Sequence, residues 1–424
     1  MTQEIIALVI FIVVITLIIS GKVHETTAAL AGAAALLITH IFTITKAISY
    51  VDFDTICVLV GMMMFVSVVK HSGLFEYVAI KCAKMAKGDP WKIMVAFMIL
   101  TAVCSAFLDN VTTVLLVGPM AIIIAKILKI NPIPMLLGQI FASNIGGTMT
   151  MIGDPPNIMI GSAAHLSFLD FIENTGVACV VGLIAVIFAM KIAYKKKLKA
   201  DAKAIKKVME LDENKAISDK RLLKISVVMI LLIIIAFFFH DKLGIESGTV
   251  ALTAGVVMLL IGRQDVEETI HDVEWPTILF FIGLFVCVGG LEATGFISQL
   301  GSLIMKVSGG HLVATMLILL WASALISAIL NNVPFIATLI PLVLALGHQG
   351  MNITPLWWAI SLGACLGGNG TQIGASANVV LSGIAGKNGY PISFSRYTKV
   401  GMPVMLITIL ISTGFLLLKF GHLS

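Results

Sequence analysis

Charged residues are scarce in this sequence. Asp, Glu, Lys and Arg make up 12% of the 424 residues, whereas a soluble domain carries about 25%. Hydrophobic residues reach 58%, and the mean hydropathy is +1.04. Because so few charges cannot cover a water-facing surface of this size, the chain must be an integral membrane protein. The net charge of +5 is modest and lies mostly on one side of the membrane, which argues against nucleic acid as a partner.

Motifs of catalysis and cofactor binding are also missing. The six cysteines form no CxxC pair and are expected to be small core residues, and the nine histidines form no HxxxH or HExxH. No GxxxxGK[ST] loop occurs, so the chain by itself is not predicted to be an ATP-driven pump. We therefore expect neither an enzyme nor a resident cofactor. The first apolar run, 5–20, lacks a basic n-region and a cleavage site, which predicts a retained span rather than a signal peptide.

Long apolar runs dominate what is present. A membrane-spanning helix needs about 20 apolar residues. The chain has one long hydrophilic segment, rich in lysine, between two sets of apolar runs. We predict a first repeat at 1–194, a basic cytoplasmic linker at 195–224 and a second repeat at 225–424. The runs lie at 5–20, 26–44, 55–70, 92–128, 134–164 and 175–194, then at 225–240, 248–262, 276–291, 311–347, 355–385 and 401–419.

The second set of runs repeats the first. With an offset of 222 residues, SAFLDNV (105–111) falls on SAILNNV (327–333). With an offset of 221, GGTMTMIG (146–153) falls on GGNGTQIG (367–374). Internal symmetry of this kind is typical of secondary transporters.

Lysine and arginine indicate how the two repeats are oriented, because cytoplasmic loops are enriched in them. If each half crosses the membrane five times, and 92–128 enters and leaves on one side, 24 of the 28 basic residues lie on the side of the linker. The bias disappears if 134–164 does not cross. We therefore predict an all-α polytopic membrane protein of two inverted repeats, each with five spans plus a re-entrant hairpin and a broken helix. It would be multi-pass in the cell (inner) membrane, with both termini extracytoplasmic.

A short polar turn interrupts each of the apolar stretches 92–128 and 311–347. The turns are too short, and their flanks too apolar, for ordinary extramembrane loops, so we interpret them as tips of re-entrant hairpins. Non-helical backbone is tolerated at membrane depth only where it is buried in protein or lines a cavity. A tight turn at the far membrane surface is the alternative. The candidate binding residues in these turns are Asp109, Asn110, Thr112, Thr113, Asn331 and Asn332.

A glycine-rich break follows in each repeat. Glycine pairs end a helix, and Pro155 and Pro156 can only begin one, so the middle of each span must unwind. Unwinding frees carbonyls for a cation, and the restarted helix offers N–H groups and a positive dipole end to an anion. Because both inverted repeats contain the break, we predict one site at the pseudo-symmetry centre. Its candidate residues are Asn144, Gly147, Thr148, Thr150, Asp154, Asn157, Asn369, Thr371, Ser376 and Asn378.

Two carboxylates, Asp109 and Asp154, lie in these motifs. A carboxylate within a bilayer is costly and usually faces a functional cavity. Their counterparts in the second repeat are Asn331 and Ala375, so both acids belong to one half. This asymmetry predicts that the first half handles a cation, Na+ or H+, with Asp109 and Asp154 as candidate Na+ ligands. A capped turn at Asp109 and a plain helix cap at Asp154 are the structural alternatives, and both roles can coexist.

These motifs resemble the ion transporter superfamily, and within it the arsenite-pump and NhaD-like permease group that includes the melanosomal P protein. The resemblance covers essentially the whole chain. More distantly, the chain is similar to the sodium-coupled dicarboxylate carriers, although those have Ser-Asn-Thr at both hairpin tips, where this chain has Asp-Asn-Val and Asn-Asn-Val. The resemblance implies a homodimer, elevator-type movement and, for an arsenite pump, a cytoplasmic ATPase partner. It rests on SAFLDNVTTVLL (105–116), IGDPPN (152–157), GACLGGNGTQIGASANVV (363–380) and SGIAGKNGY (382–390).

The sequence thus predicts a cation-coupled secondary transporter of a small anion, or an oxyanion such as arsenite, surrounded by membrane lipid. In this hypothesis Asp109 and Asp154 serve the coupling ion, while tip amides and broken-helix hydroxyls bind the substrate. One alternative is a Na+/H+ antiporter of NhaD type, in which the same carboxylates exchange Na+ for protons. Another is a sodium-coupled di- or tricarboxylate symporter. An ion channel would need an open pore, against which the paired hairpins argue.

Overall fold

The structure is a computed structural model that describes residues 3–423, and the regular elements in that range are all helices. Eight of these helices are long and apolar enough to cross a membrane, and the bent pair α17 (Phe296–Val307) and α18 (Leu312–Ser327) passes the same test as one unit. Helices satisfy their own backbone hydrogen bonds, which lipid cannot do. The predicted all-α polytopic fold of two inverted repeats is confirmed.

The two halves share one order of helices, except that the short α10 of the first half has no separate counterpart in the second. The first half contains α1 (Gln3–Ser20), α2 (Glu25–Ile38), α3 (Ile44–Ile48), α4 (Phe53–Lys70), α5 (Leu74–Met85), α6 (Pro90–Phe107), α7 (Asn110–Leu128), α8 (Ile133–Thr148), α9 (Pro155–Ala164), α10 (Phe168–Phe171) and α11 (Val177–Tyr194). The second half contains α13 (Lys220–Phe239), α14 (Ser247–Gly262), α15 (Val266–Asp272), α16 (Trp275–Ala293), α17, α18, α19 (Asn332–His348), α20 (Thr354–Gly367), α21 (Ser376–Lys387) and α22 (Phe394–Phe420).

Each hairpin turns where the sequence supplies a new helix cap. Between α6 and α7, Leu108 is extended and Asp109 caps α7 by accepting a hydrogen bond from the Thr112 N–H at 2.8 Å. Between α18 and α19, Asn331 caps α19 by accepting a hydrogen bond from the Val333 N–H at 3.3 Å. Both hairpins therefore reverse the chain within a few residues.

The two breaks unwind residues 149–154 and 368–375, with only a 3₁₀ turn in the second. Glycine lets each broken helix touch the backbone of the preceding hairpin. A Cβ on Gly146 would lie 2.2 Å from the backbone of α6, and one on Gly367 would lie 2.6 Å from that of α18. The broken helices are thus held against the hairpin arms on both sides of the pseudo-dyad.

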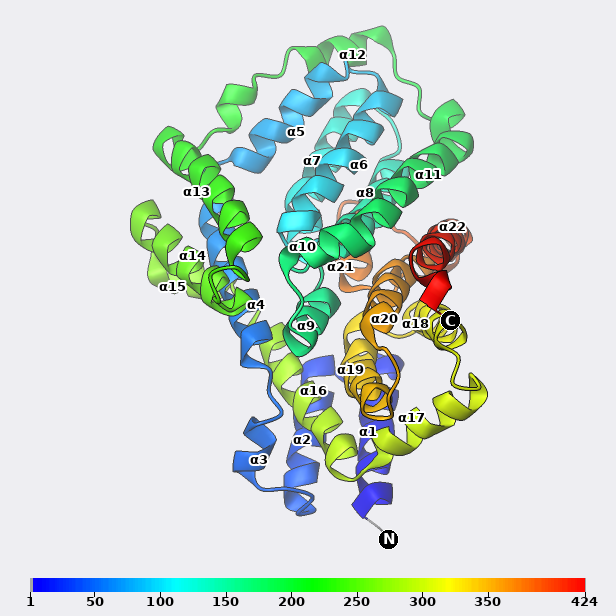
Figure 1. The fold of residues 1–424 in the computed structure, drawn as a ribbon. Helices are drawn as coiled ribbons and strands as arrows, with labels where there is room; N and C mark the ends of the chain where they lie inside the picture. Colours follow the sequence, from blue (N-terminus) through cyan, green and yellow to red (C-terminus); the bar gives the residue numbers. More distant parts are fainter. Residues whose placement is uncertain (1–2, 424) are drawn as a thin grey trace.

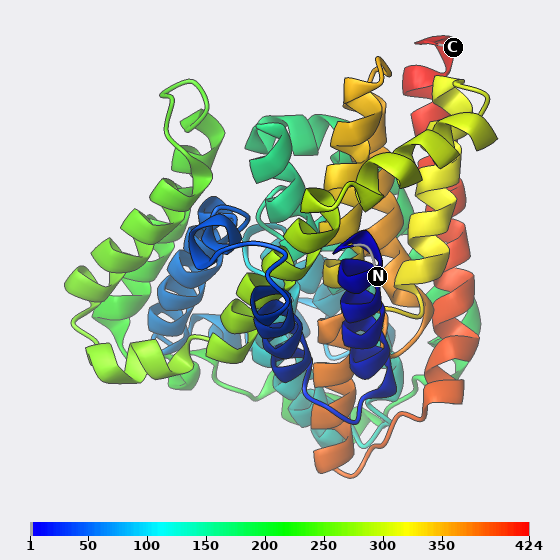
Figure 2. The ribbon, with the colours of Figure 1, turned by 90° about the horizontal axis from the view of Figure 1, so that it is seen from below.

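Helix packing divides the molecule into two groups. The frame consists of α1, α2, α4, α13, α14 and α16, in which α4 packs along α14 and α2 along α16. Figures 1 and 2 show these pairs side by side, so each half supplies a partner to the other. The hairpin bundle consists of α6–α9, α11 and α18–α22. The short helices α5 and α17 connect the frame to the bundle in each half.

The segment between α11 and α13 is folded onto the first half. It contains α12 (Ala202–Met209), which lies across the ends of α5 and α7 (Figure 1). Its Glu213 carboxylate pairs with the Lys84 ammonium of α5 at 2.5 Å, and the Ser218 N–H donates to the Ser72 carbonyl at 3.2 Å. Helix α13 already includes 220–224, the end of the predicted linker. The face of the molecule at which the linker joins α11 to α13 is called the linker end, and the face at which α13 turns into α14 is called the far end.

Candidate functional site

A cavity of about 160 Å³ lies between the hairpin bundle and the frame. Its bundle wall is built from the beginnings of four helices, α7, α9, α19 and α21, and its frame wall comes from α2, α4 and α16. The first N–H groups of a helix are unpaired and carry a partial positive charge. Four positive helix ends therefore converge on one small volume.

Asp109 and Asp154 both line this cavity but are held differently. Asp109 accepts hydrogen bonds from the N–H and the hydroxyl of Thr112 at the start of α7. Asp154 occupies the N-cap position of α9 without capping it, and the Asn332 amide nitrogen lies 3.4 Å from each of its carboxylate oxygens. The capped turn at Asp109 is therefore present, whereas the plain cap at Asp154 is wrong. The Asp154 side chain contacts the second hairpin instead.

The tip amides of both hairpins meet at the same cavity. Asn110 donates to the Asn144 side-chain oxygen at 3.4 Å, and Asn331 donates to the Ser376 hydroxyl at 3.2 Å. Asn110 and Asn332 lie in one cavity wall although 222 positions separate them. The tips thus form a shared site between the two halves, not turns at opposite membrane surfaces.

Side chains at equivalent positions of the two repeats hold the two breaks in the same shape, behind the bundle wall of the cavity. Asn157 donates to the Thr150 carbonyl at 2.9 Å, and Asn378 donates to the Thr371 carbonyl at 2.9 Å. The hydroxyls of both threonines donate to carbonyls at the ends of the preceding hairpin arms. Because unwinding leaves backbone groups unpaired, buried polar side chains must take their place.

The sixteen predicted site residues therefore fall into two sets. Six line the cavity: Asp109, Asn110, Asp154, Asn331, Asn332 and Ser376. Ten do not line it and support the wall from within the bundle: Thr112, Thr113, Asn144, Gly147, Thr148, Thr150, Asn157, Asn369, Thr371 and Asn378. Most of these ten are hydrogen-bonded to backbone or to one another, whereas the Thr113 hydroxyl and the Asn369 amide nitrogen have no partner among the described residues. The ligand roles of both sets stay predictions.

A comparison with known families decides what kind of protein has this geometry. The model of the CitMHS family, described as citrate transporter, matches residues 15–363. The chain belongs to the CitMHS family. The match extends from α1 through the linker and into α20, so it includes both hairpins and the first break.

This CitMHS protein is similar to transporters over nearly its whole length. A transporter of Mycobacterium tuberculosis is 41% identical over 427 residues, with 99% of each chain covered. The P protein of Homo sapiens is 31% identical over 501 residues, which cover 98% of this chain and 60% of the P protein. The crystal structure of the Alcanivorax borkumensis YdaH transporter matches with a TM-score of 0.63 and 15% identity over 99% of both chains, which shows a common fold. The predicted resemblance is confirmed, and the protein is a transporter, not an enzyme.

The cavity of the CitMHS protein contains two further carboxylates that the sequence analysis missed. Glu25 is the first residue of α2, and Glu274 precedes α16 at its N-cap position. Both stand at the border of a predicted span, where a charge is typical of a loop. The repeat could have found Glu274. With the offset of 222 residues Glu274 falls on Asp52, so both halves have an acid at this position. None of the residues that line the cavity, all within 3–423, is Lys, Arg or His.

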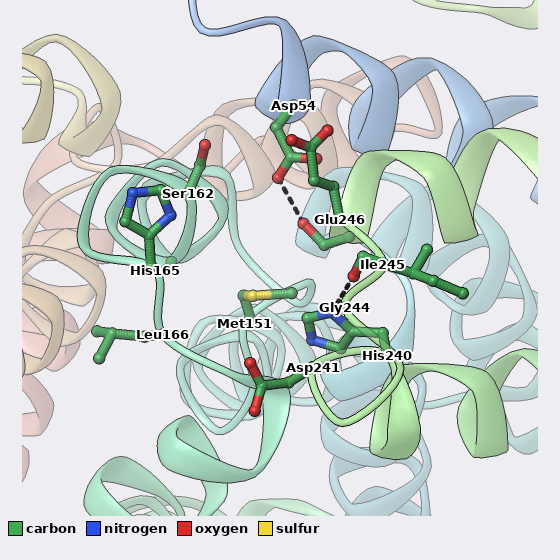
Figure 3. Close-up of a pocket in the computed structure, with 12 residues that line it drawn as sticks. Asp54, Met151, Ser162, His165, Leu166, His240, Asp241, Gly244, Ile245 and Glu246 are labelled. Atoms are coloured by element: carbon green, nitrogen blue, oxygen red, sulfur yellow. Dashed lines mark hydrogen bonds between the residues drawn. The ribbon is translucent and has the colours of Figure 1, made fainter.

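A second cavity, of about 210 Å³, lies at the far end, between α9 and the turn that joins α13 to α14 (Figure 3). Asp54 accepts hydrogen bonds from the Ser247 hydroxyl and the Gly248 N–H, both at 2.6 Å. The His240 ring bonds to the Ile245 carbonyl at 2.9 Å. No group of three His, Cys, Asp or Glu in the described part of the chain is arranged to hold a metal ion. The Asp54 carboxylate is thus engaged within the frame, in joining α4 to α14.

Proposed function

We propose that this CitMHS protein is a cation-coupled secondary transporter of a small anion or oxyanion, with Na+ or H+ as the coupling ion. The supporting observation is the unequal charge of the residues that precede the four bundle helices at the cavity. Asp109 and Asp154 precede α7 and α9, whereas Asn331 and Ala375 precede α19 and α21. The first pair offers carboxylates to a cation, whereas the second pair adds no negative charge to its two positive helix ends, which favours an anion there.

The charge balance of the cavity gives the anion a reason to depend on the cation. Each helix N-terminus is equivalent to roughly +0.5 elementary charge, so the six at the cavity, four from the bundle and those of α2 and α16 from the frame, together supply roughly +3. The four carboxylates, Asp109, Asp154, Glu25 and Glu274, supply roughly −4 when ionised. The balance of roughly −1 repels an anion until about one cation or proton has bound. We therefore propose that the cation binds first and the anion second.

Alternating access is proposed to be of the elevator type, in which the hairpin bundle moves along the frame. Leu59 of α4 and Phe281 of α16 are equivalent in the repeat, and both line the cavity. Beyond this pair the frame wall is one-sided, because it includes Glu274 and Thr277 at the linker end but not their counterparts at the far end. The cavity therefore lies toward the linker end of the frame. If the linker is cytoplasmic, as the positive-inside rule indicates, this position of the cavity supports an inward-facing state.

The test is binding and transport by the purified protein. A thermal-stabilisation screen of arsenite, phosphate, citrate and smaller carboxylates, each with and without Na+ and at two pH values, identifies the anion. Uptake of that anion into proteoliposomes is then followed with a Na+ gradient, a pH gradient or neither. We expect stabilisation and uptake to require one of the two cations. Uptake that ignores both gradients would contradict the coupling, and citrate as the best ligand would identify a sodium- or proton-coupled tricarboxylate symporter.

A second candidate is a Na+/H+ antiporter, and one observation favours it. The residues that line the cavity, all in the described range, include four carboxylates but no basic side chain, as a site for cations alone requires. The test is uptake of ²²Na+ into proteoliposomes under a pH gradient, with only an impermeant anion present. Uptake that needs the gradient identifies antiport, and uptake that appears only when a small anion is added identifies symport.

A further inference from the structure

Asp52 and Glu274 occupy equivalent positions at opposite ends of the frame. They fall on each other with the offset of 222 residues, and each stands at the N-cap position of a long frame helix, α4 or α16. Each also accepts a hydrogen bond from the hydroxyl of the threonine three positions later in the chain. Thr55 donates to the Asp52 Oδ2 at 2.6 Å, and Thr277 donates to the Glu274 Oε2 at 3.2 Å. Sequence position and hydrogen bonding thus identify one repeated acid, at the far end in α4 and at the linker end in α16.

Only one of the two acids lines the central cavity. Glu274 lines the cavity opposite Asp109 and Asp154, whereas Asp52 lies outside it. Asp52 instead accepts a hydrogen bond from the Ser162 hydroxyl at 2.9 Å. Ser162 belongs to α9, so the far-end acid of the frame is already in contact with the hairpin bundle.

The distance along α9 from its first residue to Ser162 relates the place of Asp154 at the cavity to the place of Asp52. Ser162 lies seven residues beyond Pro155, the first residue of α9, which corresponds to about 10 Å along a helix axis. A displacement of the bundle by about 10 Å toward the far end would bring the start of α9, with Asp154, to the place where Ser162 now meets Asp52. The same displacement would take Asp154 away from Glu274.

We propose that Glu274 and Asp52 alternately complete the cation site, Glu274 when the bundle lies toward the linker end and Asp52 when it lies toward the far end. This inference rests on the proposed cation-coupled, elevator-type function. The bundle takes Asp109 and Asp154 with it, while each frame acid serves the cation that enters or leaves at its own membrane face. Glu25 is not part of this pair, because its position falls on Ser247.

Geometry provides a test that needs neither the substrate nor the coupling ion. Asn110→Cys with Glu274→Cys joins two residues that line the same cavity in this structure. Asp52→Cys with Asn332→Cys is the equivalent pair in the repeat, and its members do not share a cavity here. Both pairs connect the two halves, so a disulfide keeps the halves together after cleavage at a protease site inserted in the linker. The four single substitutions control for native cysteines, and Asp89→Cys with Asn332→Cys controls for random collision.

We expect both pairs to form disulfides in membranes treated with copper phenanthroline. We also expect that prior linkage of one pair, in a four-cysteine variant, prevents linkage of the other, because each belongs to a different state. If the 110/274 pair links and the 52/332 pair never does, Asp52 does not reach the site and the inference is overturned.

Cation dependence from each membrane face is the second test. Glu274→Gln and Asp52→Asn keep side-chain size, and asparagine still caps a helix. In oriented proteoliposomes we expect Glu274→Gln to weaken the apparent affinity for the coupling cation roughly tenfold at the linker face only, and Asp52→Asn to do so at the far face only. Na+ and H+ are each titrated from both faces. Asp89→Asn, which removes an N-cap carboxylate of α6 away from the cavity, is the matched control.

The outcomes separate the inference from the function on which it rests. If the wild-type protein responds to neither cation, the proposed coupling fails and the inference fails with it. If the wild-type protein responds to a cation but either substitution shifts both faces equally, or neither face, the coupling stands and the inference alone is overturned.

Discussion

The side-chain amide of Asn144 donates a hydrogen bond to Oδ1 of Asn378 at 2.9 Å, although 234 positions separate the two residues. The same nitrogen donates to Oδ1 of Asn369 at 2.9 Å, and the Asn144 oxygen accepts from the Asn110 amide at 3.4 Å. All four side chains are buried. One asparagine therefore connects the first hairpin tip to both broken helices, in surroundings where water cannot replace a lost bond.

Asn144→Ala should destabilise the hairpin bundle. The change leaves the side-chain oxygens of Asn369 and Asn378 unpaired in a buried place, at a cost of about 1–3 kcal/mol for each. We expect a clear drop in the apparent melting temperature of the detergent-purified protein. Asn214→Ala, an exposed change in the linker, is the control and should leave it unchanged. Equal melting temperatures for the two variants would show that Asn144 does not join the halves.

Asp109→Asn should abolish coupled transport while expression and folding are kept. Asparagine can still cap α7 through the Thr112 N–H, so the hairpin keeps its shape and only the charge is lost. Asp109→Ala also removes the cap and should cost about 1 kcal/mol of stability in addition. The measurement is cation-driven uptake in proteoliposomes, normalised to protein content. Uptake by Asp109→Asn at the wild-type level would show that this carboxylate does not serve the coupling ion.

Asn110→Ala and Asn332→Ala should both impair transport, because the two amides lie in one cavity wall. Asn332→Ala also removes the amide beside Asp154, so its effect should include a change in cation dependence. Substrate uptake and cation titration of both variants provide the measurement. Impairment in only one of them would mean that the two halves do not share the site.

The fold was predictable because its signals are local. Apolar runs located the spans, and Pro155 with its neighbouring glycines located a break that the structure has at the same place. Which candidate residues line the cavity and which support its wall was not predictable in this way. Thr150 and Asp154 stand four positions apart in one break, yet the first bonds to the backbone of a hairpin and the second faces the cavity. The dihedral angles of the unwound segment decide this, and no periodic pattern reports them.

The missed carboxylates show the same limit at longer range. Glu25 and Glu274 lie at the starts of two predicted spans and meet only because α2 packs along α16. Hydropathy locates the ends of spans but does not say which ends become neighbours. The repeat offset did contain part of this information for Glu274, since it relates the residue to Asp52.

The docking of the linker should depend on pH through Glu213. The hydrogen bond from Lys84 holds the pKa of this carboxyl below its ordinary value of 4.5. A lowered pKa means that the stabilisation is present above the ordinary value and is lost as the pH falls through the lowered one. We therefore expect the linker to resist limited proteolysis at neutral pH and to become cleavable in acid. Lys84→Gln should make it cleavable at neutral pH as well, unlike Lys206→Gln, which affects an exposed pair at the end of α12.

Alanine substitution of Gly61 or Gly283 should destabilise the frame. They are equivalent in the repeat, and a Cβ would lie 2.4 Å from the α14 backbone at Gly61 and 2.8 Å from the α2 backbone at Gly283. Backbone cannot move aside as a side chain can, so alanine should cost about 1–3 kcal/mol at each position. Gly414→Ala, where a Cβ meets nothing within 4 Å, is the control and should be neutral or stabilising because alanine favours a helix. Thermal unfolding of the three variants is the measurement. If Gly61→Ala and Gly283→Ala behave like Gly414→Ala, close backbone contact between the halves does not hold the frame together.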